Sequence, residues 1–297
     1  MMETNVSIII VNYNTKELLE QCINSIYTHT KDISFEIIIV DNASVDGSQQ
    51  MIKNNYPHVV LIESKENLGF GRANNIGVKH ASGNYILLLN SDTILIENSI
   101  KVLVEYIENE NDSSLGVVGC KLLDIHQKPD VSYGHFPTIY QELFEFGLSR
   151  IFRRFYSRNL SLSIIGNGEQ IKEVDYIMGA AMFFKKSIFD SINGFDNDFF
   201  LYYEETELCF RLKRKGYRVI WNPNTSIIHY IGASGKSQDK INYWILEQLH
   251  RSKFIYYKKC HGMLMATAIK YLTVPKALII YRKFDTARIL KAILKTA

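Results

Sequence analysis

The first residues that could do chemistry follow an apolar run at positions 85–89, which is Tyr-Ile-Leu-Leu-Leu. Such a run is typical of a strand that is covered on both faces of a parallel sheet. It ends on Asn90, Ser91 and Asp92, and ligands of such sheets bind beyond the carboxyl ends of the strands. A carboxylate there can hold a divalent ion, and the ion can hold a diphosphate. The alternative is a turn or helix cap, because all three residue types suit caps.

A second candidate group is the acidic cluster of Glu204, Glu205 and Glu207, which opens a predicted helix. Basic residues fill positions 213–215 at the end of that helix, and Gly216 follows. Acids at the start and bases at the end interact favourably with the helix dipole without any catalysis. The charge pattern alone therefore leaves a structural role and a general-base role open.

Two standard phosphate-binding motifs are absent. A G-x-G-x-x-G motif would have to follow the first strand, but residues 11–15 are Val-Asn-Tyr-Asn-Thr. The Gly-Lys-Ser at 235–237 matches the end of a P-loop, yet the first glycine of that motif would fall at Tyr230. Gly69 and Gly71 precede a predicted helix, which is a weak phosphate signal by itself.

Alternating strand and helix patterns predict the elements that position these residues. Strands are predicted at 6–11, 35–40, 59–62, 85–89, 115–119, 174–184 and 219–220, and helices at 16–27, just after 48 and at 72–80. Strand–helix–strand units at this spacing predict an α/β fold with a mostly parallel sheet.

Residues 129–173 do not follow this pattern. Aromatic residues are interleaved there with four arginines on a predicted helix. Such a helix can bind nucleic acid or lie in a membrane interface. An ordinary helix that packs its aromatic side chains on the core is the alternative.

The basic residues concentrate at the C-terminal end. Residues 248–297 hold eleven Lys and Arg residues and one acid, Asp285, so this tail carries +10. Because the whole chain carries +3, residues 1–247 carry −7. A basic tail on an acidic body predicts an anionic partner surface. Leucines and isoleucines mixed with the lysines favour a membrane surface over nucleic acid.

Cysteine usage and hydropathy predict the compartment. The four cysteines form no C-x-x-C pair, which argues against a zinc site or disulfide framework and suits a reducing cytoplasm. The sequence has no signal-peptide pattern and no run of 18 apolar residues. We therefore expect a protein in solution or at the inner face of the cell membrane.

Several short motifs occur in a set order along residues 5–260. They are VSIIIVNYN at 6–14, VDNASVDGS at 40–48, NLGFGRANNIG at 67–77, NSD at 90–92, MGAA at 178–181, GFD at 194–196 and HYIGAS at 229–234. This order resembles the family 2 glycosyltransferases, most closely their rhamnosyltransferase-like branch. The resemblance implies a GT-A fold, with a Rossmann-like, mostly parallel sheet flanked by helices in residues 1–240. Residues 241–297 would form a basic, amphipathic helical extension.

The resemblance also implies a site for a nucleotide diphosphate sugar. Asp41 would accept a hydrogen bond from a pyrimidine base. The family's Asp-x-Asp motif corresponds to Asn90-Ser91-Asp92, so an amide replaces the first carboxylate. Asp92 would bind Mg²⁺ or Mn²⁺, with much of the coordination supplied by the diphosphate. His229 would complete the metal site or be structural. The implied donor-binding residues are Val11, Tyr13, Asp41, Asn42, Gly69, Arg72, Asn90, Ser91 and Asp92.

The family's catalytic base, usually within Glu-Asp, corresponds to Glu204-Glu205. We assign the base to Glu205 and rank Glu204 second, and Glu in place of Asp adds one methylene of reach. A helix start should keep this base ionised. Gly179 and Ala180 are implied in acceptor binding.

The implied function is inverting glycosyl transfer from a dTDP- or UDP-sugar, with rhamnose the leading candidate. The acceptor would be a saccharide or a lipid-linked saccharide in cell-surface polysaccharide synthesis. The alternative hypothesis is a catalytically inactive protein that keeps the nucleotide-sugar pocket, and it is motivated by the amide at position 90 and the Glu-Glu pair.

Overall fold

The computed structural model describes residues 5–110, 112–144, 148–230, 242–280 and 285–294. The strands are β1 Val6–Asn12, β2 Phe35–Asp41, β3 Val60–Glu63, β4 Tyr85–Asn90, β5 Thr93–Leu95, β6 Leu115–Leu123, β7 Val131–Gly134, β8 Ile164–Ile165, β9 Lys172–Glu173, β10 Tyr176–Ile177, β11 Ala181–Lys185 and β12 Arg218–His229. The helices are α1 Lys16–His29, α2 Ser48–Asn55, α3 Phe70–Lys79, α4 Ser99–Glu110, α5 Ile139–Phe144, α6 Leu148–Ile151, α7 Arg153–Asn159, α8 Lys186–Ser191, α9 Glu204–Arg214, α10 Tyr243–His261, α11 Met263–Ile280 and α12 Thr286–Leu294.

The central sheet has the strand order β3-β2-β1-β4-β11-β6-β12-β5, and β9 pairs with β12. Strands β1 to β4 run parallel to one another, and β11 runs antiparallel between β4 and β6. Asn12 lies beside Asp41, and Val11 lies beside Asn90. The polar residues that end three strands therefore meet at one edge, and the predicted mostly parallel sheet flanked by helices is confirmed.

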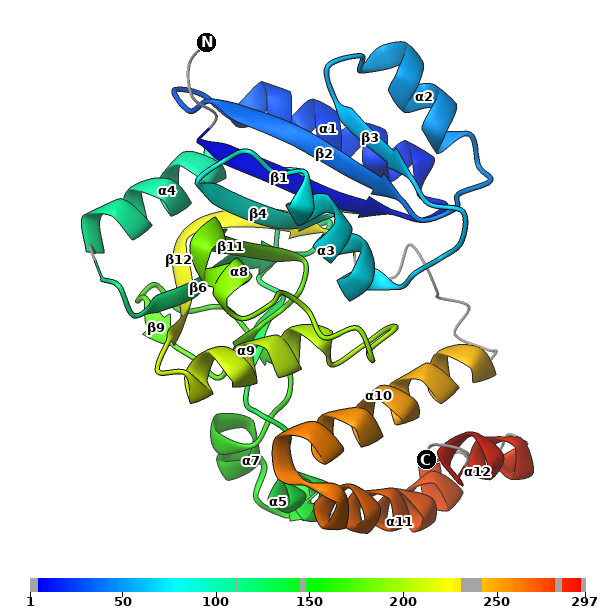
Figure 1. Cartoon of the computed structure of the whole chain (residues 1–297). Helices are drawn as coiled ribbons and strands as arrows, with labels where there is room; N and C mark the ends of the chain where they lie inside the picture. The colour runs from blue at the N-terminus through cyan, green and yellow to red at the C-terminus, as the bar shows by residue number, and fades with distance from the viewer. Residues whose placement is uncertain (1–4, 111, 145–147, 231–241, 281–284, 295–297) are drawn as a thin grey trace.

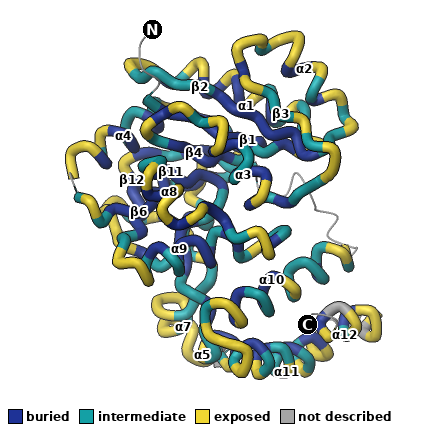
Figure 2. The backbone as a smooth tube through the Cα atoms, viewed as in Figure 1, coloured by how far each residue is buried: buried dark blue, intermediate teal, exposed yellow. Residues whose placement is uncertain are grey.

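Helices cover both faces of this sheet (Figure 1). Ile8 and Ile10 of β1 belong to a core that includes side chains of α1, α2 and α4. Ile9 belongs to the opposite core, which includes side chains of α3, α8 and α9. Successive side chains of a strand point to opposite faces, so an uninterrupted apolar strand supplies both cores. The central strands are accordingly buried along most of their length (Figure 2).

The helices α10, α11 and α12 pack on one another, and α10 also contacts α9 (Figure 1). A buried ion pair ties this group to α5, because Lys253 Nζ lies 2.5 Å from Glu142 Oε1. The tail's apolar residues divide between two environments: Ile269 and Ile289 are buried among the helices, whereas Leu264 is 90% exposed. Among the described residues, no helix is both long and apolar enough to cross a bilayer.

Two predicted elements were wrong. The strand predicted at 174–184 is two strands in different sheets, because Met178 N donates to Ser132 O whereas Ala180 O accepts from Asn90 N. The chain changes sheets between these two residues. The helix predicted within 129–173 is three short helices, α5 to α7, accompanied by strands β7 to β9.

Candidate active site

Asp41 joins the carboxyl ends of β1 and β2. Its side chain is fully buried. Oδ1 accepts from Ser44 N at 2.9 Å and from Gln49 Nε2 at 2.6 Å, and Oδ2 accepts from Asn12 Nδ2 at 2.8 Å. A carboxylate has about four acceptor positions, so three are used within the protein and one is left on Oδ2.

Asn42 holds the loop before α3. Its Oδ1 accepts from Leu68 N at 2.9 Å, and its Nδ2 donates to Asn67 Oδ1 at 2.9 Å and to Gly69 O at 3.3 Å. Gly69 has φ +83°, and a Cβ there would collide with the carbonyl of Phe200. Glycine is required because two loops meet backbone to backbone at this point. Asn42 and Gly69 thus shape the edge of the site.

Asp92 and His229 converge beyond the ends of β4 and β12. His229 Nε2 lies 3.3 Å from Asp92 Oδ1 and 3.4 Å from Asn90 Nδ2. Both side chains are largely buried, with 17% of Asp92 and 13% of His229 exposed. Ser91 Oγ is 2.8 Å from Thr15 Oγ1, which fixes the turn to the start of α1. His229 Nδ1 is buried and has no hydrogen-bond partner among the described groups.

These residues fit a metal ion that shares its coordination with a substrate. One carboxylate from the turn after β4 and one imidazole from the end of β12 face each other, which supplies two ligands of types that Mn²⁺ accepts. No set of three His, Cys, Asp or Glu side chains that could hold an ion occurs within the described ranges. The remaining ligands would be diphosphate oxygens, consistent with hard ions that bind through few carboxylates and a substrate phosphate.

The candidate base lies at the start of α9, after two strained residues. Tyr202 and Tyr203 have φ +71° and +67°, a region that bulky residues rarely adopt and that concentrates at functional sites. Glu205 follows within one turn, and a Cβ built on Gly179 would lie 3.7 Å from its Cβ. Ala180 O accepts from Asn90 N at 3.0 Å, so this segment runs from Glu205 to the Asp92 turn.

Burial controls the protonation of the two glutamates. It raises the pKa of Glu205, although the N–H groups of Glu205 and Thr206 oppose this. The pKa of Glu204 is raised well above its usual range by burial and by the neighbouring Glu205, and its Oε2 has no hydrogen-bond partner among the described groups. The prediction was that a base at a helix start stays ionised; burial opposes the ionisation of Glu205, and the helix N–H groups favour it. Burial and the neighbouring Glu205 both disfavour ionisation of Glu204, so Glu205 is the better candidate for an ionised base.

The other predicted residues lie in two places. Val11 is in register with Asn90 at the strand ends, and Tyr13 is half exposed just beyond them. Arg72 instead turns to the loop before α9, where its Nε donates to Asn197 O at 2.7 Å. Residues 231–237, which include most of the HYIGAS motif, lie outside the described residues.

Sequence reasoning missed the groups that hold Asp41, namely the side chains of Asn12 and Gln49 and the backbone of Ser44. Asn12 and Ser44 lie within the quoted motifs, but their type alone does not distinguish a ligand contact from an internal one. Gln49 lies on α2 and had no distinguishing signal.

Comparison with known proteins identifies the family. The sequence model described as "Glycosyl transferase family 2" matches residues 7–192, which is more than half of the chain. The chain belongs to glycosyltransferase family 2. The matched region contains the strand-end residues and the Gly179 segment, whereas α9 and His229 lie beyond it.

Two curated relatives and one solved structure illustrate the range of similarity. The chain is 27% identical over 73% of its length to the low-salt glycan biosynthesis hexosyltransferase Agl10 of Haloferax volcanii, and covers 64% of that protein. It is 24% identical over 86% of its length to N-acetylglucosaminyl-diphospho-decaprenol L-rhamnosyltransferase of Mycobacterium tuberculosis, and covers 84% of it. The structure of GalNAc-T7 with UDP, GalNAc and Mn²⁺ matches with a TM-score of 0.62 at 13% identity, over 98% of this chain and 55% of that one. This likeness identifies the GT-A fold.

Proposed function

We propose that this protein is an inverting glycosyltransferase that uses a nucleotide diphosphate sugar and a divalent metal ion. The observation that supports this most is the approach of Asp92 Oδ1 to His229 Nε2 at 3.3 Å, beyond the strand ends. The Gly179–Ala180 segment connects this pair with Glu205. A metal ion can stabilise the departing diphosphate and a carboxylate can take the acceptor's proton, which are the two tasks of single-displacement glycosyl transfer.

The donor would bind along the ends of β1, β2 and β4. Asp41 Oδ2 would accept from the ring N–H of uracil or thymine once the groups that cover this buried carboxylate move aside, since a carboxylate forms strong hydrogen bonds with such donors. We propose a dTDP- or UDP-sugar, and rhamnose as the sugar by analogy with the mycobacterial relative's name. Asn90, Ser91 and Asp92 would face the diphosphate, with Val11 and Tyr13 beside the nucleoside.

Asp92 and His229 would hold Mg²⁺ or Mn²⁺, which when bound supplies Lewis-acid stabilisation of the departing diphosphate. GalNAc-T7 binds Mn²⁺ together with UDP, and the present ligand pair is compatible with that ion. Because the protein contributes few ligands, we expect the ion to be held weakly until the donor binds.

Glu205 would take the proton of the acceptor hydroxyl as the oxygen attacks the anomeric carbon. The raised pKa of Glu205 suits this role, because a general base works best when its pKa is near the operating pH. Glu204, which holds a proton more tightly, would leave a single negative charge at the start of α9. Attack opposite the leaving diphosphate inverts the configuration at the anomeric carbon.

The acceptor would be a saccharide or lipid-linked saccharide in cell-surface polysaccharide synthesis, since the mycobacterial relative is named for a decaprenol-linked one. We propose that residues 241–297 are a helical extension to the catalytic domain (1–240) that contacts the inner face of the cell membrane. Leu264, Tyr271 and Leu278 of α11 are exposed at seven-residue spacing, which makes an apolar stripe on a basic helix. The wild type should bind vesicles that contain anionic lipid, and the double variant L264E/L278E should bind them less. Equal binding of the two proteins would show that this stripe does not contact the membrane.

The activity can be tested by a donor screen. Purified protein is incubated with dTDP- and UDP-sugars in Mg²⁺, Mn²⁺ or a chelator, and release of the nucleoside diphosphate is measured. We expect metal-dependent hydrolysis of at least one donor. Nucleotide-sugar binding without hydrolysis, with or without saccharide acceptors, would instead support the inactive binding protein.

A further inference from the structure

One side of α10 contacts the loop of residues 195–203 along its length. The contacts come from Trp244, Ser252, Tyr256 and Lys259. Their spacings of eight, four and three residues place these side chains on one side of a helix. The loop leads directly into α9 and the candidate base, so α10 packs against the segment that precedes the base.

Two of the contacts are between aromatic rings. Trp244 packs edge-on against Phe200 with ring centroids 5.6 Å apart. Tyr256 packs against Tyr203 at 5.5 Å, and Tyr256 is fully buried. Aromatic pairs in this range contribute about 0.5–1.5 kcal/mol beyond the area they bury.

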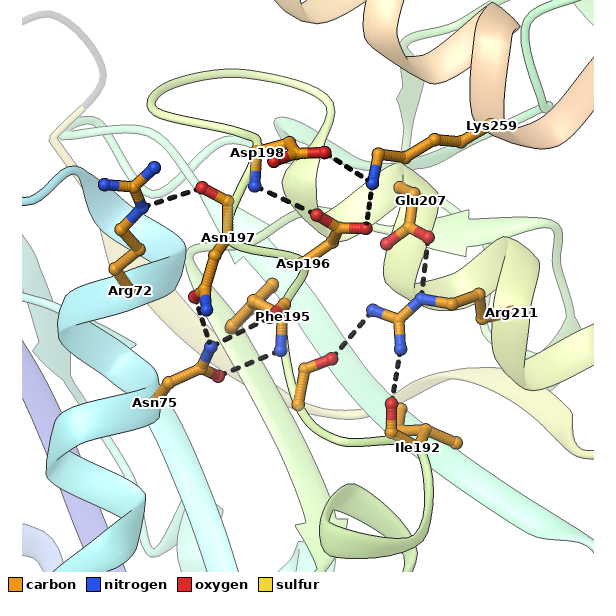
Figure 3. A network of polar contacts seen from close by, with 11 residues as sticks. Arg72, Asn75, Ile192, Phe195, Asp196, Asn197, Asp198, Glu207, Arg211 and Lys259 are labelled. Carbon is orange, nitrogen blue, oxygen red and sulfur yellow. Dashed lines mark hydrogen bonds and ion pairs between the residues drawn. The ribbon is translucent and has the colours of Figure 1, made fainter. Parts of the chain in front are cut away.

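The other two contacts are polar. The buried Ser252 donates from Oγ to Leu201 O at 2.7 Å. Lys259 Nζ lies 2.7 Å from Asp196 Oδ2 and 2.6 Å from Asp198 Oδ2, so one ammonium joins two carboxylates (Figure 3). Its hydrogen bond to Asp198 is the main reason why the pKa of that carboxyl lies below its usual value.

The opposite side of the loop is held by α3. Asn75 donates from Nδ2 to Phe195 O at 2.8 Å and accepts from Phe195 N at 2.9 Å. Arg72 donates to Asn197 O (Figure 3). The loop therefore lies between α3 of the catalytic core and α10 of the C-terminal helices.

The strained residues lie between these contacts and the base. Tyr202 and Tyr203 both have positive φ, and such conformations persist only where surrounding contacts enforce them. Leu201 and Tyr203, on either side of Tyr202, are both held by α10. Loss of these contacts would let the backbone relax just before Glu204.

We propose that α10 positions the base of this enzyme, with Lys259 and Ser252 as positioning residues that act through the 195–203 loop. The proposal rests on the proposed function, because it assigns the base to Glu205. The C-terminal helices are then part of the catalytic unit, and any membrane contact by α11 is an additional role. A displacement of about 1 Å of a catalytic group can cost a hundredfold in rate.

The test compares full-length Lys259→Met with Lys258→Met, which removes the neighbouring exposed lysine that makes no close ion pair with the loop among the described contacts. In donor hydrolysis with Mn²⁺, we expect K259M to lower kcat roughly tenfold or more with little change in donor KM. K258M should match the wild type, and Lys259→Arg should restore most of kcat. Ser252→Ala should lower kcat in the same way.

Hydrogen exchange provides a second measurement that does not require turnover. K259M should accelerate exchange of amides in residues 195–203, while the strands β1 and β4 keep their protection. Equal kcat in K259M and K258M, or a fall in K259M with unchanged exchange in the loop, would overturn the positioning role. A wild type that hydrolyses no donor would contradict the proposed function, and unchanged loop exchange in K259M would separately contradict the α10 contact.

Discussion

The two halves of the site differ in how their polar groups are satisfied. At the ends of β1 and β2, Asp41 and Asn42 are almost fully hydrogen-bonded within the protein. At the end of β12 and the start of α9, buried atoms of His229, Glu204 and Glu207 have no partner among the described groups.

This difference separates scaffold from chemistry. Buried polar groups are nearly always paired, and a fully satisfied network rigidifies the elements that it joins. An unpaired buried group costs free energy, and a bound ligand or a proton transfer is one way in which such a group is used. We infer that the Asp41 network preorganises the donor edge, whereas the Asp92–His229 pair and the glutamates perform the chemistry.

The largest effect is expected for Asp92→Asn. The carboxylate would be lost from the metal site, so donor hydrolysis should fall roughly a hundredfold or more. The free energy of unfolding should change little, because the side chain's close contact among the described ones is with His229 alone. Hydrolysis assays and urea unfolding measure the two quantities, and metal-dependent hydrolysis that survives in D92N would place the ion elsewhere.

The same chemical change at Asp41 should lower the free energy of unfolding, which the change at Asp92 should not. An amide offers one oxygen where Asp41 uses two to accept from three donors. At least one buried donor would lose its partner in Asp41→Asn, which costs about 1–3 kcal/mol of unfolding free energy. The free energies of unfolding of D41N and D92N are measured in urea and compared. Equal values would contradict the structural role of the Asp41 hydrogen bonds.

A smaller effect is expected for Glu204→Gln, in the pH dependence of the free energy of unfolding. Because burial raises the pKa of Glu204 above its usual 4.5, the folded protein binds this proton more tightly than the unfolded chain. The stabilisation by this proton is full below about pH 4.5 and is lost as the pH rises toward the folded-state pKa. Gln does not ionise, so the free energy of unfolding of E204Q should exceed that of the wild type at pH 8 and equal it near pH 4.

Glu207→Gln is the matched control for this measurement. Glu207 pairs with Arg211, whose Nε donates to Oε1 at 2.6 Å, so E207Q should lose stability near neutral pH. If both variants or neither became more stable than the wild type at pH 8, burial would not disfavour ionisation of Glu204 in particular.

The sequence predicted the parallel half of the fold because each strand there is an apolar run that ends on a polar residue. The run at 174–184 looked equally continuous, but the change of sheet at Gly179 depends on hydrogen bonds to Ser132 and Asn90, which are distant in sequence. The packing of α10 against the 195–203 loop was missed for the same reason, because its contacts also join residues that are distant in sequence. The leucines and isoleucines of the tail were assigned to lipid, whereas Ile269 and Ile289 are buried against protein.

The order of the motifs led to the predicted site residues, whereas their burial and hydrogen bonds could not be predicted from it. The family resemblance implied that His229 could complete the metal site of Asp92, and the structure brings the two side chains to 3.3 Å. The same motifs gave Asp41 and Asn42 as ligand contacts, although most of their hydrogen bonds are internal. Burial of Glu204 was also not predictable, because charge pattern at a helix start carries no information on tertiary packing.

The most direct test of the account is the turnover of Glu205→Gln with a donor that the wild type hydrolyses. Gln keeps the shape of the side chain and cannot take a proton, so kcat should fall roughly 10²- to 10⁴-fold while nucleotide binding by calorimetry is unchanged. In the wild type, kcat should rise with pH through the raised pKa of Glu205, and this limb should vanish in E205Q. Near-normal turnover by E205Q, or a larger loss in E204Q, would contradict the assignment of the base.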